Sequence, residues 1–440
     1  MTEKAAKWRD CLDIAAISDV GQRRSNNQDS HIEVVASGVE EWQQWGHLFV
    51  VADGMGAHAA GELASKMAVE KIAHHYKKYL DLSPPQALKK AIEMANGEIY
   101  RRGQENPDFH NMGTTASAMV LLPQGALFGH VGDSRVYRVR QGHLQQLTFD
   151  HSLVWEMQAA GHLAKDDNLA SMVPKNVITR SLGPAANVEV DVEGPYPLAV
   201  GDTFLLCSDG LTARVEDDEL GAVMGVMEPA LATQLLVDLA NARGGPDNIT
   251  ITIVKIIGER AATNEQDHEP ISIGSIKPPK PVHPALLITL GVSLLLALMM
   301  LASDNPIPAG VAGVVGLVSL GIFLYQKFGQ VASRQSLAPG SMLGKGPYVT
   351  IENVANQKIA EKFATTTNTL KSTAQSRGLA VDWSQFDAFT AQAEQQRQAG
   401  DFAGGVRGCC HAISFLLSEM RSPKNQASFS GPAADNESVL

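Results

Sequence analysis

Acidic residues in this 440-residue sequence follow short apolar segments, an arrangement that could gather several carboxylates around one cation. The run Leu48–Ala52 is short, contains two valines and is bounded by turn-forming residues, which predicts a buried strand. Asp53 lies where this strand would leave the core, and Gly54 permits close approach of the backbone to a ligand. Carboxylate and carbonyl oxygens are the ligands that Mg²⁺ and Mn²⁺ prefer, so both residues are candidate metal ligands. The alternative interpretation is an ordinary Asp-Gly turn without chemistry.

Similar arrangements recur in four other parts of the chain. Asp29 ends a polar loop that also contains Arg24, and Asp133 lies between two segments of alternating polarity. Asp209 repeats the pattern of an apolar run followed by Asp-Gly, and Asp247 lies in a Gly-Pro-Asp-Asn turn. A single acidic residue of this kind is usually a cap or a turn former. Several of them at strand ends can converge on one cleft, so we expect a shared metal site.

The ordered set of motifs resembles the metal-dependent protein phosphatases of type 2C in their bacterial form, over residues 10–258. In chain order, the motifs are Arg24–Asp29, Val51–Gly56, Gly132–Arg135, Val177–Gly183, Ser208–Gly210 and Gly245–Asn248. Each motif alone is a weak signal, but their common order is specific. The resemblance implies an α+β fold, an α-β-β-α sandwich in which helices flank two antiparallel sheets, with a metal site at one end.

The resemblance also implies a role for each acidic motif. Asp53 would bridge two divalent ions, Mn²⁺ or Mg²⁺, and Gly54 would offer its carbonyl oxygen to one of them. Asp209 and Asp247 would hold the other ion, and Asp29 would orient metal-bound waters. A bridging water, with its pKa lowered by the metals, would be the nucleophile, and no cysteine or serine is needed for the reaction.

Three further positions bear on the implied site. Asp133 would help to hold a third, weaker ion, as in bacterial relatives. Arg24 would clamp the phosphate, because a planar guanidinium can bind two phosphate oxygens together. Met55 stands where animal members of the family have a histidine that is taken to protonate the leaving group, so the identity of the general acid stays open.

The function implied by the resemblance is hydrolysis of phosphoserine and phosphothreonine in proteins, including substrates of bacterial serine/threonine kinases. Catalysis is favoured because the set of acidic residues is intact, whereas a decayed site would be expected to lose some of them; the set is Asp29, Asp53, Asp209 and Asp247. The alternative is a regulatory or scaffolding module of the same fold, catalytically weak, that recruits partners through the C-terminal helices.

The composition is that of a folded protein, with 44% hydrophobic and 19% charged residues, and the length predicts more than one domain. The net charge of -11 argues against nucleic acid as a partner, since binding a phosphate backbone needs clustered lysine and arginine. The four cysteines offer neither a disulfide framework nor a zinc pattern, which indicates a reducing, cytosolic setting. The first residues lack the apolar core of a signal peptide.

The composition changes sharply after residue 258. Residues 259–284 are charged and then rich in proline and lysine, which predicts a linker. The segments 285–302 and 307–325 are apolar and uncharged, each near the length of about 20 residues that a membrane helix needs. Basic residues such as Lys280 and Lys327 flank the pair, so we expect an inner-membrane, multi-pass hairpin with the catalytic domain and the C-terminus in the cytoplasm. The alternative is a pair of buried core helices.

The last part of the chain is predicted to be helical. Residues 326–349 form a second linker, rich in Gly, Pro and Ser, and residues 350–422 carry apolar residues at helical spacing. The part from residue 401 to 420 loosely resembles one half of a tetratricopeptide-type helical pair, but one copy does not establish a repeat array. A small helical bundle without chemistry is the favoured interpretation. Residues 423–440 are predicted to be a disordered tail.

Overall fold

The structure is a computed structural model that describes residues 10–56, 60–163, 173–174, 177–264, 270–271, 284–303, 306–328, 336–337, 341–352, 355–422 and 425. The chain divides into two compact units. The first consists of Met1–Leu80, Ala87–Glu269 and Gly340–Leu440, and the second of Asp81–Gln86 and Pro270–Pro339. The C-terminal helices therefore belong to the same unit as the predicted catalytic motifs.

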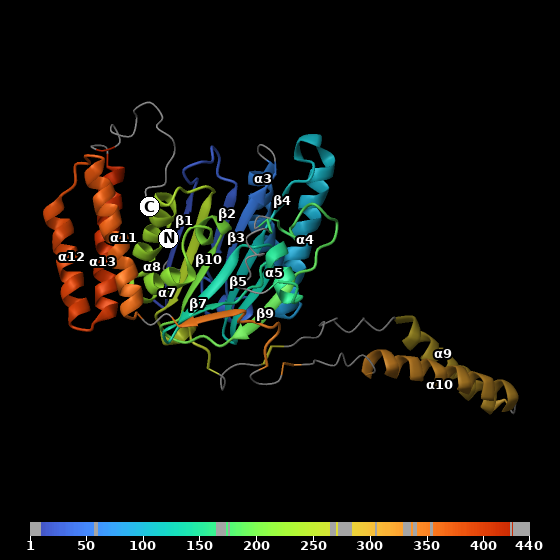
Figure 1. Cartoon of the computed structure of the whole chain (residues 1–440). Helices are drawn as coiled ribbons and strands as arrows, with labels where there is room; N and C mark the ends of the chain where they lie inside the picture. The colour runs from blue at the N-terminus through green and yellow to red at the C-terminus, as the bar shows by residue number, and fades with distance from the viewer. Residues whose placement is uncertain are drawn as a thin grey trace. The chain divides into compact units, whose positions relative to one another are not determined.

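Two antiparallel sheets form the centre of the first unit (Figure 1). One sheet has the strand order β1 (Leu12–Asp19), β11 (Ile249–Ile256), β10 (Thr203–Cys207), β7 (Arg135–Arg140), β8 (His143–Gln146) and β12 (Val349–Glu352). The other has the order β2 (Asp29–Val34), β3 (His47–Met55), β5 (Ala116–Leu122), β6 (Gly125–Val131) and β9 (Asp191–Tyr196), and β4 (Gly113–Thr114) pairs with β3. The predicted pair of antiparallel sheets is thus confirmed.

Helices flank the two sheets, as the resemblance implies. Helix α3 (Ala60–Lys78) packs on β2 and β3, and α8 (Pro229–Ala242) packs on β1 and β11. Among the described residues, the other helices outside α9 and α10 are α2 (Val39–Gln44), α4 (Pro84–Glu105), η1 (Pro107–Phe109), α5 (Leu153–Ala159), α6 (Asp209–Thr212), α7 (Asp217–Val226), η3 (Glu259–Ala261), α11 (Gln357–Ser376), α12 (Trp383–Gln398) and α13 (Phe402–Arg421).

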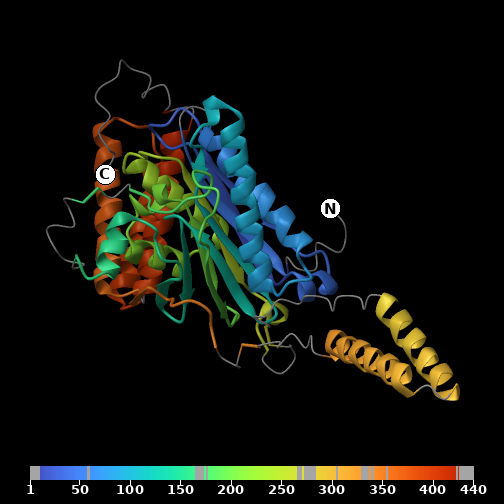
Figure 2. The same ribbon diagram turned by 90° about the vertical axis from the view of Figure 1, so that its right-hand side faces the viewer.

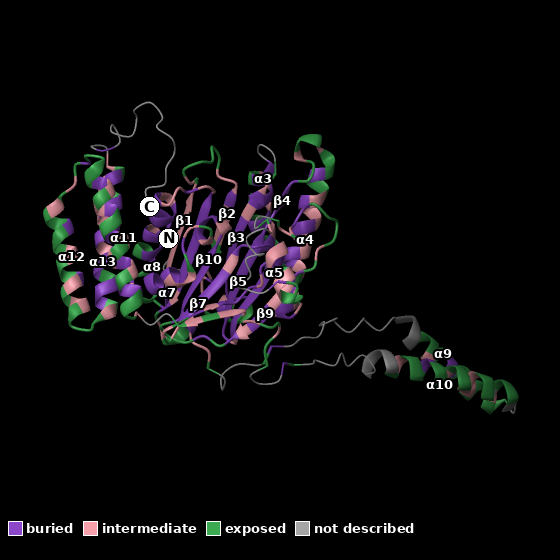
Figure 3. Ribbon diagram, in the orientation of Figure 1, coloured by how far each residue is buried: buried purple, intermediate pink, exposed green. Residues whose placement is uncertain are grey.

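The central strands are mostly apolar because both of their faces are covered. Strands β5 and β6 are buried at every residue, and Figure 3 shows the central strands as the most buried part of the unit. A strand covered on both faces has a continuous apolar sequence instead of alternating polarity. This explains why the apolar run Leu48–Ala52 predicts a strand, which the structure extends to His47–Met55.

The C-terminal helices α11, α12 and α13 share one hydrophobic core with α7 and α8. Phe363 and Ile413 from the C-terminal helices are buried in this core together with Leu220 of α7 and Leu235 of α8. Both ribbon views show these helices, coloured orange and red, beside the sheets (Figures 1 and 2). The hydrophobic core thus extends from the sheet that contains β7, β10 and β11 into the C-terminal region.

The second unit contains α9 (Pro284–Ala302) and α10 (Pro306–Phe328), which pack against each other. Gly316 faces Ser293, since a Cβ atom added at Gly316 would lie 3.0 Å from the Ser293 hydroxyl oxygen. Most described residues of both helices are exposed, as the green colouring in Figure 3 shows. Within the described residues, no helix combines the length and the hydropathy required of a membrane span.

Some segments singled out in the sequence lie outside the described residues. They include most of the predicted linker 259–284, much of the linker 326–349, and the predicted disordered tail 423–440 except Asn425. Asn425 is buried, and its side chain accepts a hydrogen bond from the Ala380 amide at 2.8 Å. The domain boundaries expected from the sequence stay a prediction.

Candidate metal centre

The candidate site begins where β2 and β3 pair. Asp29, the first residue of β2, lies directly opposite Asp53, near the end of β3. The backbone amide of Gly54 donates to the carbonyl of Gln28 at 3.1 Å, which extends the pairing by one more contact. The antiparallel register therefore brings together two carboxylates that are 24 residues apart in the chain.

Gly54 lies in a position that no other residue could occupy without a shift of the backbone. An added Cβ atom would lie 2.1 Å from the carbonyl oxygen of Gly61 and 2.5 Å from that of Gln28. The close approach of β3 to the first turn of α3 therefore depends on a residue without a side chain.

Asp209 joins the cluster from the other sheet. It is the first residue of α6 and directly follows Ser208, whose hydroxyl group donates to Asp29 Oδ2 at 2.7 Å. The same hydroxyl oxygen accepts a hydrogen bond from the Thr250 amide at 2.9 Å. Ser208 thus connects the β10 and β11 ends of one sheet to the β2 end of the other.

Burial and mutual repulsion raise the pKa values of the clustered carboxyls. Burial raises the pKa of Asp53 well above its usual value, and the charge of Asp29 and then that of Asp209 add to this. Burial likewise raises the pKa of Asp29 to about 7, against a hydrogen bond from Ser208 that lowers it. The pKa of Asp209 is also raised, first by burial and then by the charge of Asp247. The side chains are therefore close enough to disfavour one another's ionised form.

Asp133 belongs to the same electrostatic cluster. Burial raises its pKa to about 7, and the charge of Asp209 contributes in the same direction. The turn before it requires Gly132, which has a φ of +116° and whose added Cβ would lie 2.5 Å from the Thr115 side chain. The Gly132 amide donates to His151 Nδ1 at 2.9 Å, so a buried histidine holds this turn in place.

Arg24 lies at the exposed side of the cluster. Its Nη2 is 2.8 Å from Asp247 Oδ2, and the two side chains are 49% and 34% exposed. An ion pair this exposed contributes little to stability. The ion pair instead fixes the position of the Arg24 guanidinium, which lies beside the carboxylates and is exposed to solvent.

The sequence prediction assigned no role to two residues that organise the site. Asn248 accepts a hydrogen bond from the Gln28 amide at 2.8 Å, and its side-chain nitrogen donates to the carbonyls of Val20 and Asn26. It therefore ties the Asp247 turn to the loop that carries Arg24. Its position directly after Asp247 was a signal for such a role. His151, by contrast, stands in no motif that could have pointed to it.

The residues present fit a divalent cation. Asp29 Oδ1, Asp133 Oδ1 and Asp209 Oδ1 are buried, and none of the described residues donates a hydrogen bond to them. A buried carboxylate oxygen without a partner is costly unless a cation compensates it. The donor set contains only oxygen atoms, which suits Mg²⁺ or Mn²⁺. The structure thus brings the predicted site residues together, and their individual roles as ligands stay a prediction.

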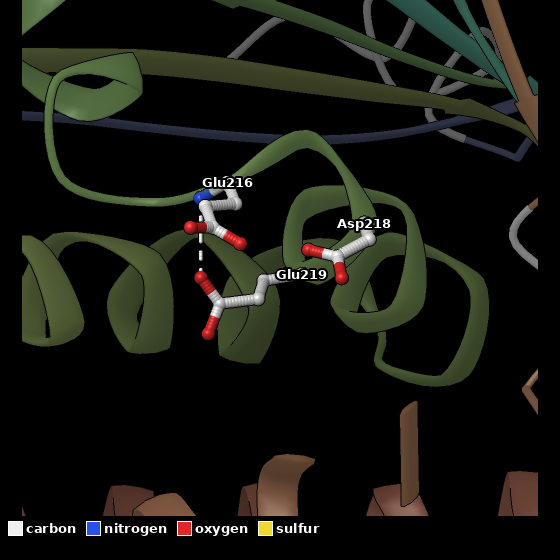
Figure 4. Close-up of side chains that lie close together, drawn as sticks. All are labelled: Glu216, Asp218 and Glu219. Atoms are coloured by element: carbon white, nitrogen blue, oxygen red, sulfur yellow. Dashed lines mark hydrogen bonds between the residues drawn. The ribbon is translucent and has the colours of Figure 1, made fainter. Parts of the chain in front are cut away.

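A second acidic group does not qualify as a metal site. Oxygen atoms of Glu216, Asp218 and Glu219 lie within 4.8 Å of one another. The close-up in Figure 4 shows these three side chains together. The Lys362 ammonium group lies 2.7 Å from Glu216 Oε2 and 2.7 Å from Asp218 Oδ1. A protein cation therefore already compensates this group.

Comparison with known proteins gives matches over the first half of the chain. Residues 21–240 match the family described as protein phosphatase 2C. The serine/threonine phosphatase stp of Listeria monocytogenes is 35% identical over 243 residues, which are 54% of this chain and 93% of that protein.

Solved structures match the same part of the chain. The Mycobacterium tuberculosis serine/threonine phosphatase PstP/Ppp is 33% identical and covers 56% of this chain and 100% of its own, with a TM-score of 0.49. The catalytic domain of the serine/threonine protein phosphatase PstP in complex with two manganese ions is 31% identical and covers 56% of this chain and 99% of its own, with a TM-score of 0.47.

Proposed function

The chain belongs to the protein phosphatase 2C family of protein serine/threonine phosphatases, and we propose that it hydrolyses phosphoserine and phosphothreonine in proteins at the carboxylate cluster. The observation that carries this proposal is the convergence of buried aspartates whose oxygens lack hydrogen-bond donors among the described residues. Family membership confirms the resemblance predicted from the motifs. The natural substrates are phosphorylated proteins, including products of bacterial serine/threonine kinases.

The carboxylate cluster would hold two divalent ions, Mn²⁺ or Mg²⁺. Asp53 and the Gly54 carbonyl would bind one ion, Asp53 would also reach the second, and Asp209 and Asp247 would complete that second site. Asp133 would contribute to a third, weaker site. Ions bound there neutralise the phosphoryl group and acidify a water, which is the chemistry that hydrolysis of a phosphate monoester requires.

The protein's own side chains position the substrate. Arg24 carries five N–H donors, so it can stay paired with Asp247 while it binds two phosphate oxygens. Asp29, held by the Ser208 hydroxyl group, has one oxygen left that can accept a hydrogen bond from a water at the site.

The second unit would tether the enzyme to the inner membrane. Helices α9 and α10 contain 19 and 23 residues, and large apolar side chains are exposed along both of them. Examples are Leu294, Leu298, Leu301, Val311, Val314 and Leu317. An exposed apolar surface of this extent is a feature of membrane or protein contact. Both flanks are basic, so the catalytic unit and the C-terminus would lie on the cytoplasmic side.

The direct test is hydrolysis of a phosphothreonine peptide by the full-length protein in detergent. Activity should require added Mn²⁺ or Mg²⁺ and disappear in EDTA, because the donor set consists of oxygen atoms. Strong hydrolysis in EDTA would contradict the proposal. Binding of Mn²⁺ and phosphopeptide without turnover would favour the alternative, a catalytically weak regulatory or scaffolding module.

A further inference from the structure

A buried glutamate at the start of α7 forms a two-point ion pair with an arginine. Glu219 is 2% exposed, and its Oε1 and Oε2 lie 2.7 Å from Nη2 and Nη1 of Arg243. Oε2 of Glu219 also accepts a hydrogen bond from the Glu216 amide at 3.1 Å, within the capping box of α7. A two-point contact of this kind fixes the orientation of the guanidinium as well as its position.

Arg243 connects the two segments that carry Asp209 and Asp247. Its Nη1 donates to the carbonyl of Arg214 at 2.8 Å, just after the short helix α6 that begins with Asp209. Arg243 itself directly follows α8, four residues before Asp247. One guanidinium therefore anchors the end of the Asp209 segment and the start of the Asp247 segment.

A lysine from the C-terminal helices completes this arrangement. Lys362 of α11 places its ammonium group 2.7 Å from both Glu216 Oε2 and Asp218 Oδ1, and 3.9 Å from Glu219 Oε2. Lys362 and Arg243 together offset two of the three acidic charges. Without Lys362, Arg243 would be the one cation among the described residues that pairs with this group, and Glu216 and Asp218 would repel the carboxylate that holds Arg243.

The C-terminal helices are fixed against α7 and α8 by further contacts besides the shared core. Arg407 Nε donates to the carbonyl of Val226 at 2.9 Å, and Arg421 Nη1 lies 2.6 Å from Asp238 Oδ1. Lys362 therefore lies on a helix of a region that is packed against α7 and α8, and this packing places its ammonium group beside the acidic residues.

We propose that Lys362 is a positioning residue for the metal centre, acting through Glu219 and Arg243 on Asp209 and Asp247. The C-terminal helices then set how tightly the site binds divalent metal. This inference rests on the proposed function, because it assumes that these two aspartates hold an ion. Residues that hold metal ligands in place commonly affect metal affinity although they do not touch the metal.

The test compares Lys362→Met with Lys371→Met in the full-length protein in detergent. Lys371 is a matched control, since it lies on the same helix, its side chain is also 30% exposed, and it pairs with Asp387 at 2.6 Å within the C-terminal helices. Mn²⁺ binding is measured by the electron paramagnetic resonance signal of the free ion, without turnover. Lys362→Met should weaken Mn²⁺ affinity about three- to tenfold, and Lys371→Met should change it by less than about twofold.

A charge rescue separates positioning from packing. Adding Asp218→Asn to Lys362→Met removes the excess negative charge and should restore most of the Mn²⁺ affinity, and Lys362→Arg should retain it. Unchanged affinity in Lys362→Met, equal losses in both methionine variants, or no rescue by Asp218→Asn would each overturn the inference. Failure of the wild-type protein itself to bind Mn²⁺ would instead refute the proposed function, and this inference with it.

Discussion

Asp29 and Asp53 are direct cross-strand partners where β2 begins and β3 nears its end. Directly opposite side chains in an antiparallel pair have Cβ atoms about 5 Å apart, and like charges at such positions destabilise the sheet. The pKa of each carboxyl is raised, in both cases first by burial. The pair therefore destabilises the metal-free fold and favours binding of a cation.

Asp53→Asn should stabilise the metal-free protein. The substitution keeps the shape of the side chain and removes one charge from a buried group of carboxylates, which should raise the free energy of unfolding at pH 7.5 by roughly 1 kcal/mol. Thermal unfolding in EDTA measures this effect. In Mn²⁺ the order should reverse, because the wild-type protein gains stability from metal binding and the variant loses a ligand. A variant less stable than the wild type in EDTA would show that Asp53 is structurally required in its charged form.

Arg24→Ala should mainly raise KM for a phosphothreonine peptide. The guanidinium would hold the phosphate in the ground state and in the transition state alike, so its loss should weaken binding about tenfold with a smaller effect on kcat. Steady-state kinetics at saturating Mn²⁺ measures both constants. Arg23→Ala is the matched control, since Arg23 is also exposed and adjacent in the chain, and its KM should stay close to the wild-type value. An unchanged KM in Arg24→Ala would show that a positive group other than Arg24 binds the phosphate.

The local features of the site could be predicted from the sequence, whereas its long-range contacts could not. The apolar run before Asp53 and the glycine after it indicate a strand end, and the structure places them at the end of β3. The hydrogen bond from Ser208 to Asp29 joins residues 179 positions apart. No local pattern encodes this contact, because it depends on how the two sheets pack.

The docking of the C-terminal helices could not be predicted from the sequence for the same reason. The helical spacing of Ile359, Phe363 and Leu370 indicates an apolar face, and all three residues are buried in the structure. The spacing does not show which surface covers that face, and in the structure α11 packs on α13 and on α7. Strand β12 has only four residues, too few for a periodic signal, and joins the sheet by pairing with β8.

Phe363→Ala should destabilise the phosphatase unit as a whole. Phe363 is 2% exposed in the core shared by the C-terminal helices and α7. Removal of a buried phenylalanine side chain typically costs about 3–5 kcal/mol. Circular dichroism and loss of activity on heating should therefore shift together to lower temperature. Phe389→Ala is the control with a smaller expected shift, since Phe389 is only partly buried. Unfolding of the helices at a temperature where activity persists would show that the two regions are independent.

His47 should make the fold sensitive to acid. Burial lowers the pKa of its imidazole to about 3, far below the usual value of 6.5. Between these values the unfolded chain binds a proton that the folded protein does not bind, so stability is complete above pH 6.5 and falls as the pH decreases towards 3. The expected loss is about 1.4 kcal/mol per pH unit.

His47→Gln isolates this contribution from other titrating groups. The variant should be less stable than the wild type at pH 7.5, because His47 Nδ1 accepts a hydrogen bond from the Ala36 amide at 2.9 Å. The difference in unfolding free energy between the two proteins should shrink as the pH falls below 6.5. Only the wild type has an imidazole at this position that is protonated in the unfolded chain and neutral in the folded protein. Chemical denaturation at several pH values measures it, and a difference that is constant from pH 7.5 to 5 would contradict the prediction.

The proposed membrane tether predicts where the full-length protein is found. Exposed leucine and valine side chains on α9 and α10 would be buried in lipid, and two packed helices can satisfy their own backbone hydrogen bonds there. The full-length protein should sediment with membranes and resist carbonate extraction. Replacing Leu294, Leu298 and Val311 by serine should move it towards the soluble fraction, whereas serine at the exposed Leu231 of α8 should not.

The topology of the hairpin can be tested separately from its insertion. A reporter that works only outside the cytoplasm is fused at Asp304, between α9 and α10, and in a second protein after Leu440. The basic flanks of the two helices predict signal from the first fusion and none from the second. The C-terminal helices must share a compartment with α7 and α8, because the buried core joins them. Signal from the fusion after Leu440 would therefore exclude the proposed hairpin.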